Sequence, residues 1–425
     1  MFQIPTKNLI FPTLMWLSSR ILLILVMLII LPIISKNPEL QKYGWWDVFF
    51  AWDSIWYHQI VHSGYNYGLD GKQYSVAFFP LYPLTIKILM LLGIPFPWAA
   101  LLINNLAFLA ALIVLYRWVD EKYGENAARW GTAALAWCPY SIYGTVIYTE
   151  GLFLLFSTSA LRAFERREYG WVTLWGTLST ATRITGVALI PAFLLTSLKE
   201  RRPIKAYIAS CAVAGGLLLY ILFCFFKFGD GFAFLQAQRG WRTSVGFVGE
   251  GWLQLLMQIF LGSENVEQGN IRNITHPIIV TLILVGVGFI WRFHQRLGEI
   301  WTCYGFYLFW FCLWLQTRAT PSNNIFLGEP LVKMTIIFGG LALLWYYRSQ
   351  LPFSAIAYGF TTYGIILNTG LVLSVERYTY AIAPLSFALG LLLSRHPRWG
   401  YPAMVFFAIL MVLFSLLFAQ DMWLA

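Results

Sequence analysis

The stretch WWDVFFAWDSIWYHQIVHSGYNYG, residues 45–68, places two carboxylates, Asp47 and Asp53, among many aromatic side chains. An ionised carboxylate is costly in apolar surroundings unless it is paired or serves a function. Trp56 and Tyr57 follow Asp53 at spacings of three and four, which predicts a helix with Asp53 at its N-terminal end.

Two interpretations of Asp53 are open from the sequence. Aspartate is a favoured N-cap, and its charge suits the N-terminal end of a helix dipole. Alternatively, the helix terminus holds the carboxylate ionised so that it can act as a general base, and the aromatic rings stack on a sugar or lipid. Asp47 has the same ambiguity, and we expect a structural role for it.

Two histidines on the same predicted helix raise the possibility of a metal site. His58 and His62 have the i, i+4 spacing of metal ligands on a helix. Only one nearby carboxylate could be a third ligand, and no second cluster of histidine or cysteine supports the site. We therefore interpret them as interfacial histidines and expect no cofactor, with a divalent metal as the less favoured alternative.

Several arginines lie at positions that suit the binding of an anionic ligand. Arg183, in TATRITGVALIP, lies near the end of an apolar run with no acid close in sequence, and ionisable groups in membrane segments are often functional. A guanidinium matches phosphate oxygens bidentately, so Arg183 or Arg377 could neutralise a lipid-borne phosphate. The structural alternative is an ion pair between Glu150 and Arg183. Arg239 and Arg242, in QAQRGWR, are interpreted as solvated charges of a loop.

The rest of the chain is suited to holding these residues in a membrane. Of its 425 residues, 59% are hydrophobic and 11% charged, whereas soluble domains have about 25% charged residues. Apolar runs recur along the whole chain, so we predict an all-α polytopic membrane protein with about 12–13 transmembrane helices.

We predict a single integral-membrane domain over 1–425, with the N-terminus inside. Two outer segments, 35–97 and 227–274, interrupt the apolar runs. The first contains Asp53 and interfacial helices, one of them in AFFPLYPLTIKILMLLG. Basic groups such as RAFERRE and KERRPIK lie on the opposite side, which is the positive-inside pattern. Polar residues collect at the outer face, so the chemistry is expected there.

The distribution of charges and cysteines argues against a nucleic-acid-binding protein and against a cysteine metal site. The net charge of +10 is spread in short groups between apolar runs, so we expect no nucleic-acid partner. The five cysteines lie within apolar runs, without metal spacing, and are expected to be small core residues. A group-transfer enzyme at the outer face would need a donor carried by lipid, because soluble nucleotide-activated substrates are not normally available there.

Six blocks of sequence occur in this order along the chain: Trp52-Asp53-Ser54 with Gly64-Tyr65, AFFPLYP (77–83), Pro139-Tyr140-Ser141 with Tyr148-Thr149-Glu150, TRITG (182–186), Phe234-Leu235 with Gln238, and Arg377-Tyr378 with Pro384. Together they resemble the GPI mannosyltransferase II family and its bacterial relatives, which are integral-membrane glycosyltransferases with the GT-C fold. The family has an Arg-Ser-Asn-Gly pattern where this chain reads RITG, so substrate contacts there can differ.

The resemblance implies a GT-C fold with its active site at the outer face, under the first outer loop. It also implies a polyprenyl-phosphate sugar donor and gives Asp53 the position of the catalytic base. The expected reaction inverts the configuration of the anomeric carbon and moves a hexose, with mannose favoured, to a lipid-linked or glycan acceptor. One or two arginines would stabilise the leaving lipid phosphate. The expected location is a bacterial plasma membrane with the site facing outside, or the endoplasmic reticulum membrane in a eukaryote.

The candidate site residues form three groups: the catalytic base Asp53; the phosphate-binding residues Arg183, Arg377 and Tyr378; and the substrate-pocket residues Trp52, Trp56, Tyr57, His58, Tyr148, Glu150 and Gln238. Two other functions remain open. A transporter or flippase of a lipid-linked sugar would share the basic outer pocket, although symmetric halves with broken helices are not evident. A non-enzymatic scaffold would not need the base and both arginines on one side.

Overall fold

The computed structural model describes residues 7–34, 46–242, 245–317, 328–370, 372–422 and 424. Parts of both predicted outer segments, 35–45 and 243–244, lie outside the described residues. In the described ranges the chain is built from helices, with one isolated β-bridge between Gly246 and Thr369 and no strand. The predicted all-α class is confirmed.

The α-helices follow the chain in this order: α1 (Lys7–Leu25), α2 (Leu31–Ile34), α3 (Asp53–Ser63), α4 (Leu81–Leu91), α5 (Phe96–Tyr123), α6 (Glu125–Trp137), α7 (Glu150–Glu165), α8 (Tyr169–Thr182), α9 (Leu189–Lys199), α10 (Ile204–Ala212), α11 (Gly215–Phe228), α12 (Ala233–Gln236), α13 (Gly249–Leu261), α14 (Ser263–Gln268), α15 (Thr275–Gln316), α16 (Glu329–Met334), α17 (Gly340–Tyr346), α18 (Phe353–Leu367), α19 (Val375–Tyr380), α20 (Ala383–Arg395) and α21 (Pro397–Phe418). Short π-helices, η1 (Val26–Ile30) and η8 (Thr335–Gly339), continue α1 and α16. Short 3-10 helices are η3 (Asp47–Phe49), η4 (Ser75–Ala77), η5 (Pro139–Gly144), η6 (Ile184–Ala188) and η7 (Ala237–Gly240).

The described helices confirm an integral membrane protein. Six helical stretches are long and apolar enough to cross a membrane: Leu9–Ile34, Phe96–Tyr123, Ile204–Phe228, Thr275–Gln316, Glu329–Tyr346 and Pro397–Phe418. Four shorter apolar helices accompany them: Leu81–Leu91, Ile184–Lys199, Phe353–Leu367 and Ala383–Arg395. The prediction of about 12–13 spans also included α6, α7 and α8. These helices are shorter, with 13, 16 and 14 residues, and α7 is almost fully buried inside the molecule.

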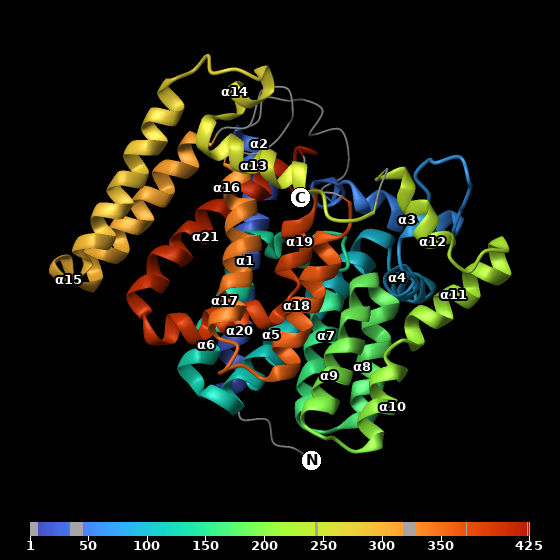
Figure 1. Cartoon of the computed structure of the whole chain (residues 1–425). Helices are drawn as coiled ribbons and strands as arrows, with labels where there is room; N and C mark the ends of the chain where they lie inside the picture. The colour runs from blue at the N-terminus through green and yellow to red at the C-terminus, as the bar shows by residue number, and fades with distance from the viewer. Residues whose placement is uncertain are drawn as a thin grey trace.

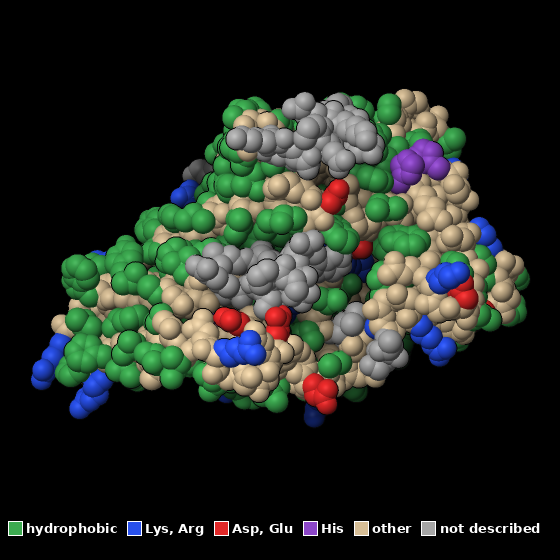
Figure 2. All heavy atoms as spheres, turned by 90° about the horizontal axis from the view of Figure 1, so that it is seen from above, with side chains coloured by type: hydrophobic (Ala, Val, Ile, Leu, Met, Phe, Trp, Pro, Cys, Tyr) green, Lys and Arg blue, Asp and Glu red, His purple; other side chains and the backbone are tan. Residues whose placement is uncertain are grey.

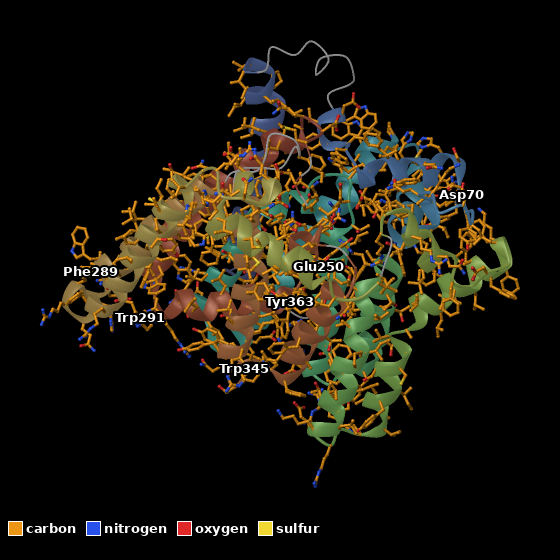
Figure 3. All side chains as sticks on the ribbon, turned by 45° about the horizontal axis from the view of Figure 1, so that its top comes forward. Asp70, Glu250, Phe289, Trp291, Trp345 and Tyr363 are labelled. Carbon is orange, nitrogen blue, oxygen red and sulfur yellow. The ribbon has the colours of Figure 1, made fainter. Side chains whose placement is uncertain are left out.

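The helix α15 is in fact two arms joined at Gly298, whose φ of 75° breaks the helical conformation. The arms form a hairpin that projects from the rest of the molecule (Figure 1). Figure 3 shows Phe289 and Trp291 at the projecting end of this hairpin, pointing outward. Apolar grooves of about 530 Å³ and 450 Å³ lie along its arms. Such a surface suits contact with lipid tails, as expected for a membrane protein.

The interior is formed by α5, which packs against α6 and α7, together with α7 on α8 and α20 on α6. At one end of this bundle lie α3, α12 and α13, near the C-terminus (Figure 1). The helices α3 and α4 have 11 residues each. At about 1.5 Å per residue they are too short to cross a hydrocarbon core of about 30 Å. This length fits the interfacial helices predicted for the first outer segment.

Candidate active site

Four charged side chains from distant parts of the chain form a connected set of ion pairs. Arg377 Nη1 of α19 lies 2.8 Å from Asp53 Oδ2 of α3. Arg377 Nε also lies 3.4 Å from Glu150 Oε1 at the start of α7. Arg183, at the C-terminal end of α8, donates a hydrogen bond to the same oxygen of Glu150. We call Asp53, Glu150, Arg183 and Arg377 the ion-pair tetrad.

The members of the tetrad differ in exposure. The Glu150 side chain is fully buried, those of Arg377 and Arg183 are 6% and 11% exposed, and that of Asp53 is 22% exposed. Two cations and two anions give no net charge, which offsets part of the cost of removing them from water. A substrate can therefore reach Asp53 most easily, while the other three groups lie behind it.

Both arginines of the tetrad remain charged. Burial disfavours the guanidinium charge of Arg377, but neighbouring anions, Asp53 first among them, raise its pKa well above the ordinary value. Burial also opposes the charge of Arg183, whose pKa is nevertheless raised because Glu150 lies beside it. The tetrad therefore presents two permanent positive charges at the site.

Tyrosine rings enclose the two guanidinium groups. The ring of Tyr378 lies between them, with its centroid 4.9 Å from Arg183 Cζ and 5.2 Å from Arg377 Cζ. The rings of Tyr148 and Tyr143 lie 5.1 Å and 5.4 Å from Arg377 Cζ. These cation–π contacts restrict the rotation of the guanidinium groups and keep them directed toward the carboxylates.

The structure contradicts one of the two interpretations of Asp53, and its role as a general base stays a prediction. The N-cap of α3 is Trp52, which makes no side-chain capping hydrogen bond, and Asp53 is the first helical residue. The N-cap interpretation of Asp53 is therefore wrong: its carboxylate pairs with Arg377, while its backbone N–H donates to Tyr148 Oη at 3.3 Å. Trp52 has a φ of 56°, which is strained for a bulky side chain. The chain thus bends sharply just before the candidate base.

Asn104, buried in α5, fixes the start of α7 and hence Glu150. Its Nδ2 donates to the backbone oxygens of Tyr143 and Val146, at 2.8 Å and 2.7 Å. Its Oδ1 accepts from the backbone N–H of Gly151 at 2.9 Å. A Cβ on Gly151 would lie 2.3 Å from the Asn104 backbone oxygen, so only glycine fits this close approach.

Arg20, buried in α1, holds the preceding turn η5. Its guanidinium donates to the backbone oxygen and hydroxyl of Ser141, at 2.6 Å and 2.7 Å, and to Thr145 Oγ1 at 2.6 Å. The sequence interpretation missed both Arg20 and Asn104 as positioning residues. The available signal was a short polar interruption of an apolar run, Ser18-Ser19-Arg20 in one case and Asn104-Asn105 in the other.

A second group of buried charges adjoins the tetrad through α19. Lys333 Nζ of α16 lies 2.7 Å from Glu329 Oε1 and 3.3 Å from Glu376 Oε1. Glu376 and Arg377 are neighbours in α19, so ion pairs join this helix both to Lys333 of α16 and to the other members of the tetrad.

The aromatic residues predicted for the substrate pocket lie along α3. Trp56 stacks on Phe78 at 5.7 Å and meets the edge of Trp241 at 5.5 Å. Tyr57 is buried and packs against Phe78 and Tyr82. The rings of Trp56, Phe78 and Trp241 thus form a wall one helical turn beyond Asp53.

The structure does not bring every candidate to the tetrad. His58 packs against Phe50, Phe96 and His62, on another side of α3. Asp47 lies in the 3-10 helix η3 outside the tetrad, and its pKa is raised by partial burial and then by the charge of Asp421.

The remaining candidate, Gln238, lies at the edge of the site in η7, where its Oε1 accepts a hydrogen bond from Arg242 at 3.4 Å. As for a metal, no group of three His, Cys, Asp or Glu side chains in the described ranges is arranged to hold one. Both carboxylates of the tetrad face guanidinium groups. Figure 2 shows the molecule from above the view of Figure 1. Acidic and basic side chains are visible in a recess of this upper face.

Comparison with known proteins gives a family-model match over part of the chain. Residues 35–201 match the family model described as mannosyltransferase (PIG-V). The match confirms the resemblance over the segment that contributes Asp53, Glu150 and Arg183. No curated protein sequence matches the chain.

Several solved structures are similar at low sequence identity. Oligosaccharyltransferase AglB from Archaeoglobus fulgidus, in complex with an inhibitory peptide and a dolichol-phosphate, is 12% identical, with 98% of this chain and 56% of that chain covered and a TM-score of 0.46. The apo form of the Archaeoglobus fulgidus oligosaccharyltransferase is 11% identical, with 97% and 56% covered and a TM-score of 0.49. ArnT from Cupriavidus metallidurans, bound to undecaprenyl phosphate, is 14% identical, with 88% and 72% covered and a TM-score of 0.38. This chain spans about half the length of the oligosaccharyltransferase chains.

Proposed function

We propose that this membrane protein, whose residues 35–201 match a mannosyltransferase family, is an inverting glycosyltransferase. It would move a hexose, with mannose favoured, from a polyprenyl-phosphate donor to a lipid-linked or glycan acceptor at the extracytoplasmic face. The observation that carries the proposal is a partly exposed carboxylate, Asp53, held against a buried guanidinium, Arg377, at one end of a membrane helix bundle.

Each part of the tetrad has a role in this reaction. Asp53 would accept the proton of the acceptor hydroxyl, whose oxygen attacks the anomeric carbon as the bond to the donor phosphate breaks. Arg377 holds Asp53 Oδ2, so we assign Oδ1 to the proton. The electron pair of the broken bond goes to the lipid phosphate, whose growing charge the nearby guanidinium groups would stabilise. General-base catalysis of this kind contributes about 10²–10⁴-fold to the rate.

The proposed donor can be tested directly. Purified protein would be incubated with a membrane lipid extract and either labelled polyprenyl-phosphate mannose or labelled GDP-mannose. We expect label in an acceptor only with the lipid donor, and polyprenyl-phosphate glucose serves as the matched control for the sugar. Transfer from GDP-mannose would contradict the donor class. Movement of labelled lipid across a vesicle membrane without transfer would favour the flippase alternative.

The proposed orientation predicts which introduced cysteines an impermeant reagent reaches. Lys72, whose side chain is 79% exposed, and Glu267 lie in the two outer segments, whereas Lys205 lies in an inner basic group. In a variant without the five native cysteines, K72C and E267C should react with an impermeant maleimide in intact cells. K205C should react only after permeabilisation. The reverse pattern would place the tetrad on the cytoplasmic side.

A further inference from the structure

Arg242 is a partly buried cation with only neutral partners in the described part of the chain. Its Nη1 donates to the backbone oxygen of Thr369 at 2.6 Å, and its Nη2 donates weakly to Gln238 Oε1 at 3.4 Å. Its Nε is buried and has no hydrogen-bond partner among the described residues. A charge withdrawn from water is unfavourable unless an opposite charge and hydrogen bonds compensate it. An anion would supply both.

Neighbouring contacts place Arg242 at the rim of the active site. The ring of Trp241, the preceding residue, lies 5.5 Å from that of Trp56 and 5.8 Å from that of Phe78. Trp56 is one helical turn along α3 from Asp53. The segment that carries Arg242 therefore packs on the aromatic wall beside the candidate base.

A second contact ties Arg242 to the segment that leads into α19. Besides the hydrogen bond from Arg242, Thr369 pairs with Gly246 in the isolated β-bridge. Burial lowers the pKa of Arg242, and the nearby Tyr378 partly opposes this effect. Tyr378 is the ring between the two arginines of the tetrad, so Arg242 lies near the same site.

Both arginines of the tetrad already face carboxylates, so a third guanidinium is better placed to bind an incoming phosphate. Arg183 faces Glu150, and Arg377 faces both Asp53 and Glu150. An incoming phosphate would have to compete with these carboxylates for either arginine. Arg242 has no such competitor among the described residues.

We propose that Arg242 is the primary anchor for the phosphate group of a polyprenyl lipid, both in the sugar donor and in the lipid phosphate left after transfer. The inference rests on the proposed function and names the residue that recognises its donor. The guanidinium fork can bind two phosphate oxygens at once. Binding there leaves the Asp53–Arg377 pair intact, so the base stays in position.

Equilibrium binding to purified protein in nanodiscs tests this assignment without any transfer reaction. The probes are undecaprenyl phosphate, undecaprenol, which lacks the phosphate, and inorganic phosphate. Hydrogen bonds to charged groups suggest that R242Q binds undecaprenyl phosphate roughly 10–100-fold more weakly than the parent. R242K, which keeps the charge but loses the fork, should be intermediate. The matched control is R239Q, three residues earlier and exposed, which should bind like the parent.

The probes separate the possible explanations. Undecaprenol binding should be the same in all variants, and an equal loss for undecaprenol and undecaprenyl phosphate would overturn the assignment by indicating a collapsed loop. An effect confined to inorganic phosphate would overturn the lipid assignment. If the parent does not bind undecaprenyl phosphate, the donor class of the proposed function fails. If the parent binds it and R242Q binds it equally well, only the role of Arg242 fails.

Discussion

Replacing Asp53 by asparagine should reduce sugar transfer at least about 10²-fold while donor binding persists. Asparagine has nearly the same shape, but its amide cannot accept the proton of the acceptor hydroxyl. The stability of the protein should fall, but less than when Arg377 is removed. The Asp53 side chain is 22% exposed, Arg377 keeps Glu150 as a second anion, and the asparagine amide oxygen can still accept a hydrogen bond from Arg377. Transfer assays and thermal unfolding of the same purified protein measure both effects.

The matched control for this prediction is D47N. Asp47 lies six positions earlier in the same aromatic segment, but it belongs to η3 and takes part in none of the ion pairs that define the tetrad. We expect D47N to transfer sugar at nearly the parental rate. Parental turnover by D53N would refute the assignment of the base, and an inactive D47N would move that assignment to Asp47.

Replacing Arg377 by glutamine should impair both stability and transfer. The change removes the cation that faces Asp53 and Glu150, and leaves two carboxylates with Arg183 as their only cation in the tetrad. Breaking a buried ion pair by removing one partner typically costs about 3–5 kcal/mol. The Arg377 side chain is only 6% exposed, so solvent screens the remaining charges weakly. Transfer should also fall because Asp53 Oδ2 loses its hydrogen-bond donor.

A double variant separates the charge balance from the chemistry. In D53N/R377Q both members of one ion pair are neutral, and the Glu150–Arg183 pair is untouched. We therefore expect this variant to unfold at a higher temperature than R377Q alone, while transfer remains lost. If the double variant is no more stable than R377Q, uncompensated charge is not the cause of the destabilisation. R377K should be intermediate, since an ammonium keeps the charge but lacks the fork.

Much of the architecture could be predicted from local sequence. The apolar runs indicated the membrane class, since a hydrocarbon core accepts few charged side chains. The helix that begins at Asp53 and the short helix within AFFPLYPLTIKILMLLG both appear at the predicted places. These features depend on residues within a few positions of one another, so spacing and residue type were sufficient to predict them.

The partners of the charged side chains could not be read from the sequence. The Glu150–Arg183 pair had been considered because it joins neighbouring helices, but Asp53 and Arg377 are 324 positions apart. Such a contact depends on how α3 and α19 pack at the end of the bundle. The number of residues between Asp53 and Arg377 in the sequence does not indicate how close the two side chains lie in the folded protein.

The sequence by itself determined that this is a helical membrane protein with a candidate base among aromatic side chains and arginines. Only the tertiary structure decided that Asp53 pairs with Arg377 rather than capping its helix, that His58 lies apart, and that Arg242 is partly buried without a carboxylate. The physical reason is that helix formation follows from local periodicity, whereas the cost of a buried charge depends on the groups that packing places around it.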